Sequence, residues 1–248
     1  MTTYRPPVVR IAHRGASGLF PENTLLAFRR AVEIGTDMLE LDVQVTRDGA
    51  LVVMHDQTLE RTTNGAGRVC DHSLSELRLL DAGQGERIPV LAEVMELAQA
   101  AGVRLVVEIK GDDEARSQAI TAALLPALAA AGWVDRAIVT AFQPGALRQA
   151  RALEPHLSTM LDPAPWDGSL SPRAVCEQAL AAGANIVGSD HRYVTQALVD
   201  ECRLTGLTLW PWTANTPADL GRLLRLGVPG LLTDRPDVLN EVLHGFAF

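Results

Sequence analysis

Cysteine is scarce in this chain of 248 residues, and the spacing of the three that occur does not indicate disulfide bonds. Cys70, Cys176 and Cys202 are an odd number, lie far apart and form no CxxC pair. The sequence therefore argues against a disulfide framework, and we expect a reducing compartment, the cytoplasm. No run approaches the ~18 apolar residues of a membrane span. Residues 1–15 contain no apolar segment typical of a secretion signal, so we expect none.

Positive charge is also in deficit. The formal net charge is -8, and no block of basic residues offsets it. Nucleic acids and anionic membrane surfaces are therefore not expected as partners, because both bind basic surfaces. A phosphate-bearing substrate requires a site that is locally positive. What the chain does have is 47% hydrophobic and 21% charged residues, which is typical of a globular domain with a sizeable core.

Short β-branched runs alternate with Ala- and Leu-rich helical patterns along nearly the whole chain. Strands are expected at residues 8–13, 37–43, 104–110, 137–141, 158–161, 185–188, 207–212 and 230–233. Helices are expected at residues 23–34, 90–101, 113–131, 144–152, 172–182, 193–204, 216–226 and 236–245. Several of these helices end at a glycine that precedes the next strand, where a C-terminal glycine is favoured. Eight strand–helix units predict an α/β fold, a TIM (β/α)8 barrel.

One stretch breaks this alternation. About 45 residues separate the second strand from the helix near residue 90, more than an ordinary connection contains. The stretch begins with a hairpin pattern that has Asp48 and Gly49 at its turn, and it includes a capping-box spacing at Ser73 and Glu76. We predict one domain, residues 1–248, with a small inserted lobe at about residues 56–88. Because βα loops leave the carboxyl ends of barrel strands, the lobe should lie on the catalytic face.

Ionisable residues gather at the ends of the first three expected strands. Glu40 and Asp42 are two residues apart and point to the same face, as do Glu108 and Lys110. Neighbouring strands lie only ~5 Å apart, so the three carboxylates would crowd one region, which is unfavourable without a cation or shared protons. Oxygen ligands favour Mg²⁺, Ca²⁺ or Mn²⁺ over zinc. The alternative is a set of structural ion pairs, Glu108 with Lys110 and Asp42 with an arginine.

Two histidines are expected beside these carboxylates. His13 ends the first strand, and His55 follows the hairpin after the second. Histidine is the side chain best suited to give and take protons near neutral pH. The other histidines are expected to be hydrogen-bonded residues outside the site, although His191, after the sixth strand, could face it.

Several motifs along the chain together resemble one family, the glycerophosphodiester phosphodiesterases. The first is AHRGASGLFPENTLLAF, with its HRG and PENT elements. The others are LELDVQVTRDGALVVMHDQTLERTTNGAG, VEIKGD, PWTAN and TDRPD, at residues 39–67, 107–112, 211–215 and 233–237. They span almost the full length in the family's order, and the chain is similar to the short cytosolic bacterial members. Each motif alone is weak, but the set is highly specific.

The resemblance implies a TIM barrel with the family's inserted lobe and assigns roles to the residues that match its motifs. The implied general acid/base pair is His13 and His55, the implied metal ligands are Glu40, Asp42 and Glu108, the implied phosphate-binding residues are Arg14 and Lys110, and the implied walls against the glycerol moiety are Trp212 and Phe142. Ordinary core packing is the alternative for both aromatic residues.

Other motif positions are open to a structural interpretation. Glu22 and Asn23 could support the site from behind, or Asn23 could cap the following helix. Asp234, with Pro236 at the first helical position, is interpreted as part of a helix start. The chain departs from the family pattern at Val90, Ala92 and Ala141, none of which is a proposed ligand or proton carrier.

The function implied is metal-dependent hydrolysis of a small glycerophosphodiester to sn-glycerol 3-phosphate and an alcohol, by direct attack of water or through a cyclic phosphate. The three carboxylates outnumber Arg14 and Lys110 by one negative charge, and one divalent cation would make the site net positive. We therefore expect the cation to be needed for substrate binding as well as for chemistry. The alternatives are a lysophospholipase D acting at the same site and a catalytically silent barrel used for binding.

Overall fold

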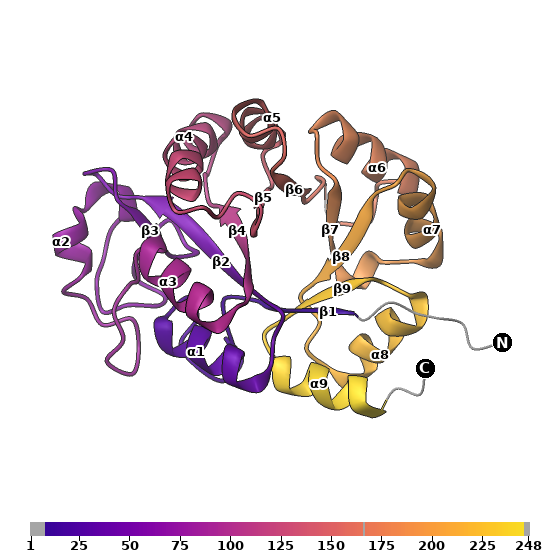
Figure 1. The fold of residues 1–248 in the computed structure, drawn as a ribbon, viewed down its shortest axis with the longest axis horizontal. Coiled ribbons are helices and arrows are strands. Elements are labelled where there is room, and N and C mark those ends of the chain that lie inside the picture. The colour runs from indigo at the N-terminus through magenta and orange to yellow at the C-terminus, as the bar shows by residue number, and fades with distance from the viewer. Residues whose placement is uncertain (1–7, 166, 246–248) are drawn as a thin grey trace.

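Eight parallel strands follow one another around a nearly closed barrel in the computed structural model, which describes residues 8–165 and 167–245 (Figure 1). The strands are β1 (Val9–Ala12), β2 (Met38–Val45), β4 (Arg104–Ile109), β5 (Ala137–Ala141), β6 (Ser158–Leu161), β7 (Ile186–Asp190), β8 (Thr208–Trp212) and β9 (Gly230–Thr233). They pair in the order β8-β7-β6-β5-β4-β2-β1-β9. Beyond the end of β8, the Ala214 amide donates to the Leu232 carbonyl in β9 at 3.2 Å. The predicted TIM barrel is confirmed. Residues 1–7, part of the stretch in which no secretion signal is expected, lie outside the described residues.

Helices lie on the outside of the barrel, and each except the last precedes the next strand of the barrel (Figure 1). They are α1 (Leu25–Ile34), α3 (Leu91–Ala101), α4 (Glu114–Ala130), α5 (Pro144–Leu153), α6 (Pro172–Ala181), α7 (Gln196–Leu204), α8 (Pro217–Leu226) and α9 (Pro236–Gly245). The helix expected from residue 193 begins three residues later. A 3-10 turn, His191–Tyr193, comes first, and the Thr195 side chain then accepts from the Leu198 amide as the cap of α7.

The alternation of side chains along the strands decides what lies inside the barrel. In β2, Leu39 and Leu41 pack outward into the layer between the barrel and its helices, whereas Met38 lies in a separate interior cluster with residues of six other strands. Because residues two apart share a face, Glu40 and Asp42 follow Met38 on the interior side. The acidic residues therefore lie above an apolar plug, towards the carboxyl ends of the strands.

The connection between β2 and α3 forms the lobe expected from the sequence. Strand β3 (Leu51–Val53) pairs antiparallel with the end of β2, and a 3-10 turn (Val69–Asp71) and the helix α2 (Leu74–Leu77) follow. Both halves of the capping box between Ser73 and Glu76 are present. The lobe buries apolar side chains of its own, including Leu59 and Leu77. It extends to one side of the barrel, next to β2 and α3 (Figure 1).

Candidate active site

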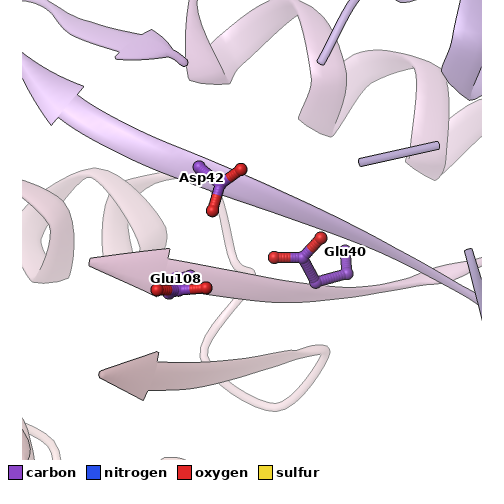
Figure 2. A group of neighbouring side chains, drawn as sticks. All are labelled: Glu40, Asp42 and Glu108. Carbon is purple, nitrogen blue, oxygen red and sulfur yellow. The ribbon is translucent and has the colours of Figure 1, made fainter. Parts of the chain in front are cut away.

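Three carboxylates from two neighbouring strands meet inside the barrel. The parallel register of β2 and β4 places Asp42 opposite Glu108, and Glu40 lies two residues before Asp42 on the same face of β2 (Figure 2). One oxygen from each side chain lies within 4.8 Å of the others. The residues are 1%, 0% and 8% exposed for Glu40, Asp42 and Glu108 respectively. Burying three carboxylates so close together is unfavourable unless positive charge or protons compensate.

Arg14 and Lys110 supply part of the compensation. The Lys110 ammonium contacts the Glu108 carboxylate and lies 3.3 Å from Asp42 Oδ1. Arg14 Nε lies 3.3 Å from Asp42 Oδ2, and the Arg14 backbone N–H donates to Glu40 Oε2 at 2.8 Å. Both ion pairs that the sequence offered as an alternative to a metal site therefore occur. They do not neutralise the cluster, because two cations face three carboxylates.

The unequal distribution of the cations separates the pKa values of the carboxylates. Burial, followed by repulsion from Asp42 and Glu108, raises the pKa of Glu40 well above its usual value. Burial likewise raises the pKa of Glu108 to about 7, although Lys110 opposes the shift. Burial also acts on Asp42, but the charges of Lys110 and Arg14 prevail and lower its pKa. The raised pKa values favour protonation of the glutamates, and one proton would offset the single negative charge that the two basic residues leave uncompensated.

The cluster fits a hard divalent cation. Among the described residues, no hydrogen bond of normal geometry reaches Asp42 Oδ1 or Glu108 Oε1, although Lys110 Nζ is near both. Buried carboxylate oxygens without such bonds are available as ligands. The ligand set is made only of oxygen, which suits Mg²⁺, Ca²⁺ or Mn²⁺.

His13 is oriented by a carboxylate at the end of the last strand. Its Nδ1 lies 2.6 Å from Asp234 Oδ1, and Ser17 Oγ and Asn215 Nδ2 donate to the same carboxylate at 2.9 and 2.6 Å. Burial alone would raise the pKa of Asp234, but the His13 interaction and these donors lower it to about 2. The carboxylate therefore remains ionised at neutral pH and favours the His13 tautomer with the proton on Nδ1.

Interpreting Asp234 only as part of a helix start was therefore incomplete. Helix α9 does begin at Pro236, but the Asp234 side chain faces His13. A signal was present in the sequence, because closure of the barrel pairs the last strand with the first. In that register Thr233 lies opposite Ala12, so the residues that follow these two strands are neighbours.

His55 has a matching arrangement with a carboxylate of its own. Its Nδ1 lies 2.6 Å from Oδ1 of the adjacent Asp56, and Gln44 Nε2 donates to the Asp56 carbonyl at 2.6 Å. Burial lowers the pKa of His55, and Lys110 adds to this effect while Asp42 opposes it. Each of the two histidines thus has Nδ1 on a carboxylate, which leaves Nε2 as the free proton acceptor.

Glu22 and Asn23 lie behind the site and contact the charged residues. Glu22 Oε1 accepts from Arg14 Nη1 at 3.1 Å, and Asn23 Nδ2 donates to Asp42 Oδ2 at 2.7 Å. Asn23 is not the cap of α1, because the Thr24 side chain accepts from the Ala27 amide instead.

A cavity of ≈ 160 Å³ opens over the carboxylates. Its lining includes the predicted site residues His13, Arg14, Glu40, His55, Glu108, Lys110, Phe142 and Trp212. Asp42 lies beneath it, in contact with Lys110. His191 is not among the lining residues that the structure describes; its Nδ1 lies 3.8 Å from Asp219 Oδ1.

Two aromatic rings form one wall of this cavity. Phe142 and Trp212 are in edge-to-face contact with their centroids 6.0 Å apart, and Lys110 Nζ lies 5.6 Å from the centre of the Phe142 ring. The Trp212 indole N–H donates to Asp162, which follows β6 and also accepts from Thr140 Oγ1 at 3.0 Å. Burial raises the pKa of Asp162 to about 6, against the effect of these donors. Sequence reasoning missed Asp162, since no motif contains it.

The barrel and its acidic, histidine-flanked cavity define a class, the barrel hydrolases that act on phosphate esters. The glycerophosphoryl diester phosphodiesterase family matches residues 13–238, and the chain belongs to this family. The glycerophosphodiester phosphodiesterase of Caldanaerobacter subterraneus subsp. tengcongensis is 38% identical, over 94% of this chain and 97% of its own. That of Bacillus subtilis is 35% identical, over 96% and 87%. The predicted family is confirmed.

Solved structures agree in fold. A phosphodiesterase of Oleispira antarctica, in complex with the product sn-glycerol-3-phosphate, has a TM-score of 0.85 and 28% identity over 97% of both chains. A putative glycerophosphoryl diester phosphodiesterase of Silicibacter pomeroyi has a TM-score of 0.89 and 28% identity, covering 98% of this chain and 95% of its own. Among the described residues, no helix has both the length and the apolar character needed to cross a membrane.

The raised pKa values of Glu40 and Glu108 predict how pH affects metal binding. Protons compete with a cation for these two carboxylates, so the affinity for the cation should increase with pH. The rise in melting temperature caused by Mn²⁺ should therefore be larger at about pH 8 than at about pH 5.5. Thermal unfolding with and without Mn²⁺ measures this difference. An equal rise at both pH values would contradict it, and Glu108→Gln should reduce the effect of the metal.

Proposed function

We propose that the chain hydrolyses glycerophosphodiesters to sn-glycerol 3-phosphate and an alcohol, with one divalent cation bound by Glu40, Asp42 and Glu108. The observation that carries the proposal is the set of three carboxylate oxygens within 4.8 Å of one another, under a cavity that Arg14 and Lys110 also line. With all three carboxylates ionised, the cluster together with Arg14 and Lys110 carries one net negative charge, and one divalent cation would bring it to one net positive charge. That charge matches a phosphodiester, which carries a single negative charge.

The cation is Mg²⁺, Ca²⁺ or Mn²⁺ in this proposal, because the ligands are all oxygens. When bound, it polarises the phosphoryl oxygens and lowers the pKa of an attacking hydroxyl group. The proposed metal ligands come from strands rather than loops, so their separation is fixed by the register of β2 and β4.

Arg14 and Lys110 bind the phosphate in this proposal. Both side chains line the cavity and are paired with carboxylates beneath it. A bound phosphate would accept charge-assisted hydrogen bonds from them. Trp212 and Phe142 provide an apolar wall for the glycerol moiety. The complex of the Oleispira antarctica relative with sn-glycerol-3-phosphate supports a ligand of this kind in the family's barrel.

His13 and His55 exchange protons with the substrate. Asp234 and Asp56 hold the Nδ1 atoms, so Nε2 of one histidine accepts the proton of the attacking hydroxyl. Nε2 of the other, in the protonated form, donates to the oxygen of the departing alcohol. Attack by water gives the products directly. Attack by the free hydroxyl of the glycerol gives a cyclic phosphate that water then opens, and both routes use the same two proton carriers.

We further propose that the chain works as a single barrel domain in the cytoplasm, with residues 56–88 as its lobe. The lobe supports one side of the site, because the Gln57 side-chain amide donates to the Lys110 carbonyl at 2.7 Å. The buried Sγ atoms of Cys176 and Cys202 lie 3.7 Å apart, and a reducing compartment would keep both as thiols.

The proposed reaction is tested with glycerophosphocholine, glycerophosphoethanolamine and glycerophosphoglycerol, each with Mg²⁺, Ca²⁺ or Mn²⁺. Release of sn-glycerol 3-phosphate should require a divalent cation and stop after treatment with EDTA. Lysophosphatidylcholine in the same assay distinguishes the proposed function from the alternative, a lysophospholipase D, which would hydrolyse this substrate. Turnover of lysophosphatidylcholine alone, or full activity after EDTA treatment, would refute the proposal.

Replacement of either proton carrier should reduce turnover strongly. His13→Ala and His55→Ala are each expected to lower kcat by about 10²–10⁴-fold, which is the usual contribution of general acid/base groups. Steady-state kinetics with saturating metal measures the loss. His244→Ala is the matched control, because His244 lies on α9 and, among the described residues, its ring bonds only the Asn240 carbonyl of its own helix. Turnover of either site variant close to that of His244→Ala would refute the proton-transfer roles.

A further inference from the structure

One arginine of the lobe contacts two carboxylates that support the site. Arg61 Nε and Nη2 donate to the Asp56 carboxylate at 2.5 and 2.9 Å. Arg61 Nη1 and Nη2 donate to the Glu22 carboxylate at 2.7 and 2.8 Å. The planar guanidinium group thus makes a two-pronged pair with each of two acids, a geometry that lysine cannot reproduce.

Each of these acids contacts a residue of the proposed machinery. Asp56 Oδ1 lies 2.6 Å from His55 Nδ1, and Glu22 Oε1 accepts from Arg14 Nη1 at 3.1 Å. The chain of contacts therefore runs from His55 through Asp56, Arg61 and Glu22 to Arg14. It joins the second residue after β3 to the second residue after β1.

We propose that Arg61 is a positioning residue, which fixes the His55 imidazole through Asp56 and the Arg14 guanidinium through Glu22. This inference rests on the proposed function, because it takes the roles of His55 and Arg14 from there. With Asp56 held in place, the His55 proton stays on Nδ1 and Nε2 faces the reaction as a free acceptor. With Glu22 held in place, Arg14 is kept over the carboxylates rather than extended into solvent.

A surface ion pair without functional effect is the competing interpretation, and the neighbouring ion pair of Arg68 provides a comparison. Arg61 and Arg68 are both lobe arginines, with side chains 47% and 45% exposed. Arg68 Nη2 bonds Asp112 at 2.6 Å, and the Asp112 side chain is also largely exposed. Exposed pairs of that kind contribute little. The partners of Arg61 are less exposed and contact His55 and Arg14. The Asp112 side chain, in the part of the chain that the structure describes, pairs with Arg68 and with no proposed site residue.

The test compares Arg61→Gln and Arg61→Lys with the matched control Arg68→Gln, all assayed with glycerophosphocholine and saturating Mg²⁺. Arg61→Gln should lower kcat by about 10–100-fold, the usual effect of losing an outer partner of an active-site residue, and should also raise KM. The reduced kcat follows from a misplaced His55, and the raised KM from a displaced Arg14. Arg61→Lys should recover only part of the loss, and Arg68→Gln should retain wild-type kinetics.

A double-mutant cycle separates positioning from general stability. Asp56→Asn and Arg61→Gln act on the same histidine, so the double variant should lose little more kcat than the worse single variant. Arg68→Gln combined with Asp56→Asn should instead give independent effects. If Arg61→Gln does not yield folded protein, Arg61→Lys takes its place in the cycle.

A second readout does not depend on activity. Nitrogen-15 NMR of labelled histidines in the Mg²⁺-loaded enzyme should show His55 with its proton on Nδ1, and a mixture of tautomers in Arg61→Gln. Wild-type kcat and an unchanged His55 tautomer in Arg61→Gln would overturn the inference while His55→Ala still shows the proposed function to hold. Equal losses in Arg61→Gln and Arg68→Gln would also overturn it. A wild-type enzyme that fails to hydrolyse any glycerophosphodiester would instead refute the proposed function, and the tautomer measurement would still decide whether Arg61 orients His55.

Discussion

The crowding of three carboxylates inside the barrel is the constraint on which the rest of the site depends. Glu40, Asp42 and Glu108 are held together by the strand register, so they cannot move apart to relieve their repulsion. The fold compensates in part with Arg14 and Lys110, and protons on the glutamates supply the remainder in the metal-free protein. A site arranged in this way is suited to exchange protons for a cation, and then to bind a monoanionic ester on top of it.

A second layer of polar residues surrounds this centre and orients it. Asp234 holds His13, and Asp56 holds His55, each through Nδ1 at 2.6 Å. The two carboxylates come from segments far apart in the sequence, one from the end of the last strand and the other from the start of the lobe. The lobe therefore contributes to the site, because it contains Asp56 and the arginine that bonds Asp56, Arg61.

The strands, the helices and the clustering of the three carboxylates could be predicted from sequence because local patterns encode them. Spacing of two residues places Glu40 and Asp42 on one face, and the glycine after α1, at residue 35, ends that helix in a left-handed conformation. The prediction was least accurate for the start of helix α7, which was expected at residue 193. The helix begins at Gln196 because the Thr195 side chain caps it.

The orienting residues were harder to predict because their roles depend on contacts between distant segments. Asp234 is 221 residues from His13 in the chain, and only closure of the barrel brings the two together. Arg61 is 39 residues from Glu22, and no periodicity relates them. Asp162 follows β6, accepts from Trp212 at the end of β8, and belongs to no motif. Side-chain pairs of this kind follow from the fold as a whole rather than from any local run of sequence.

The central claim is that the cation makes the site able to hold a phosphate. Calorimetric titration of glycerophosphocholine into the His55→Ala variant, in which turnover is suppressed, tests this claim most directly. The Mg²⁺-loaded protein should bind the diester about 10–100-fold more tightly than the EDTA-stripped protein, the usual range for coupling between two ligands. Equal affinities for the diester with and without the cation would contradict the account.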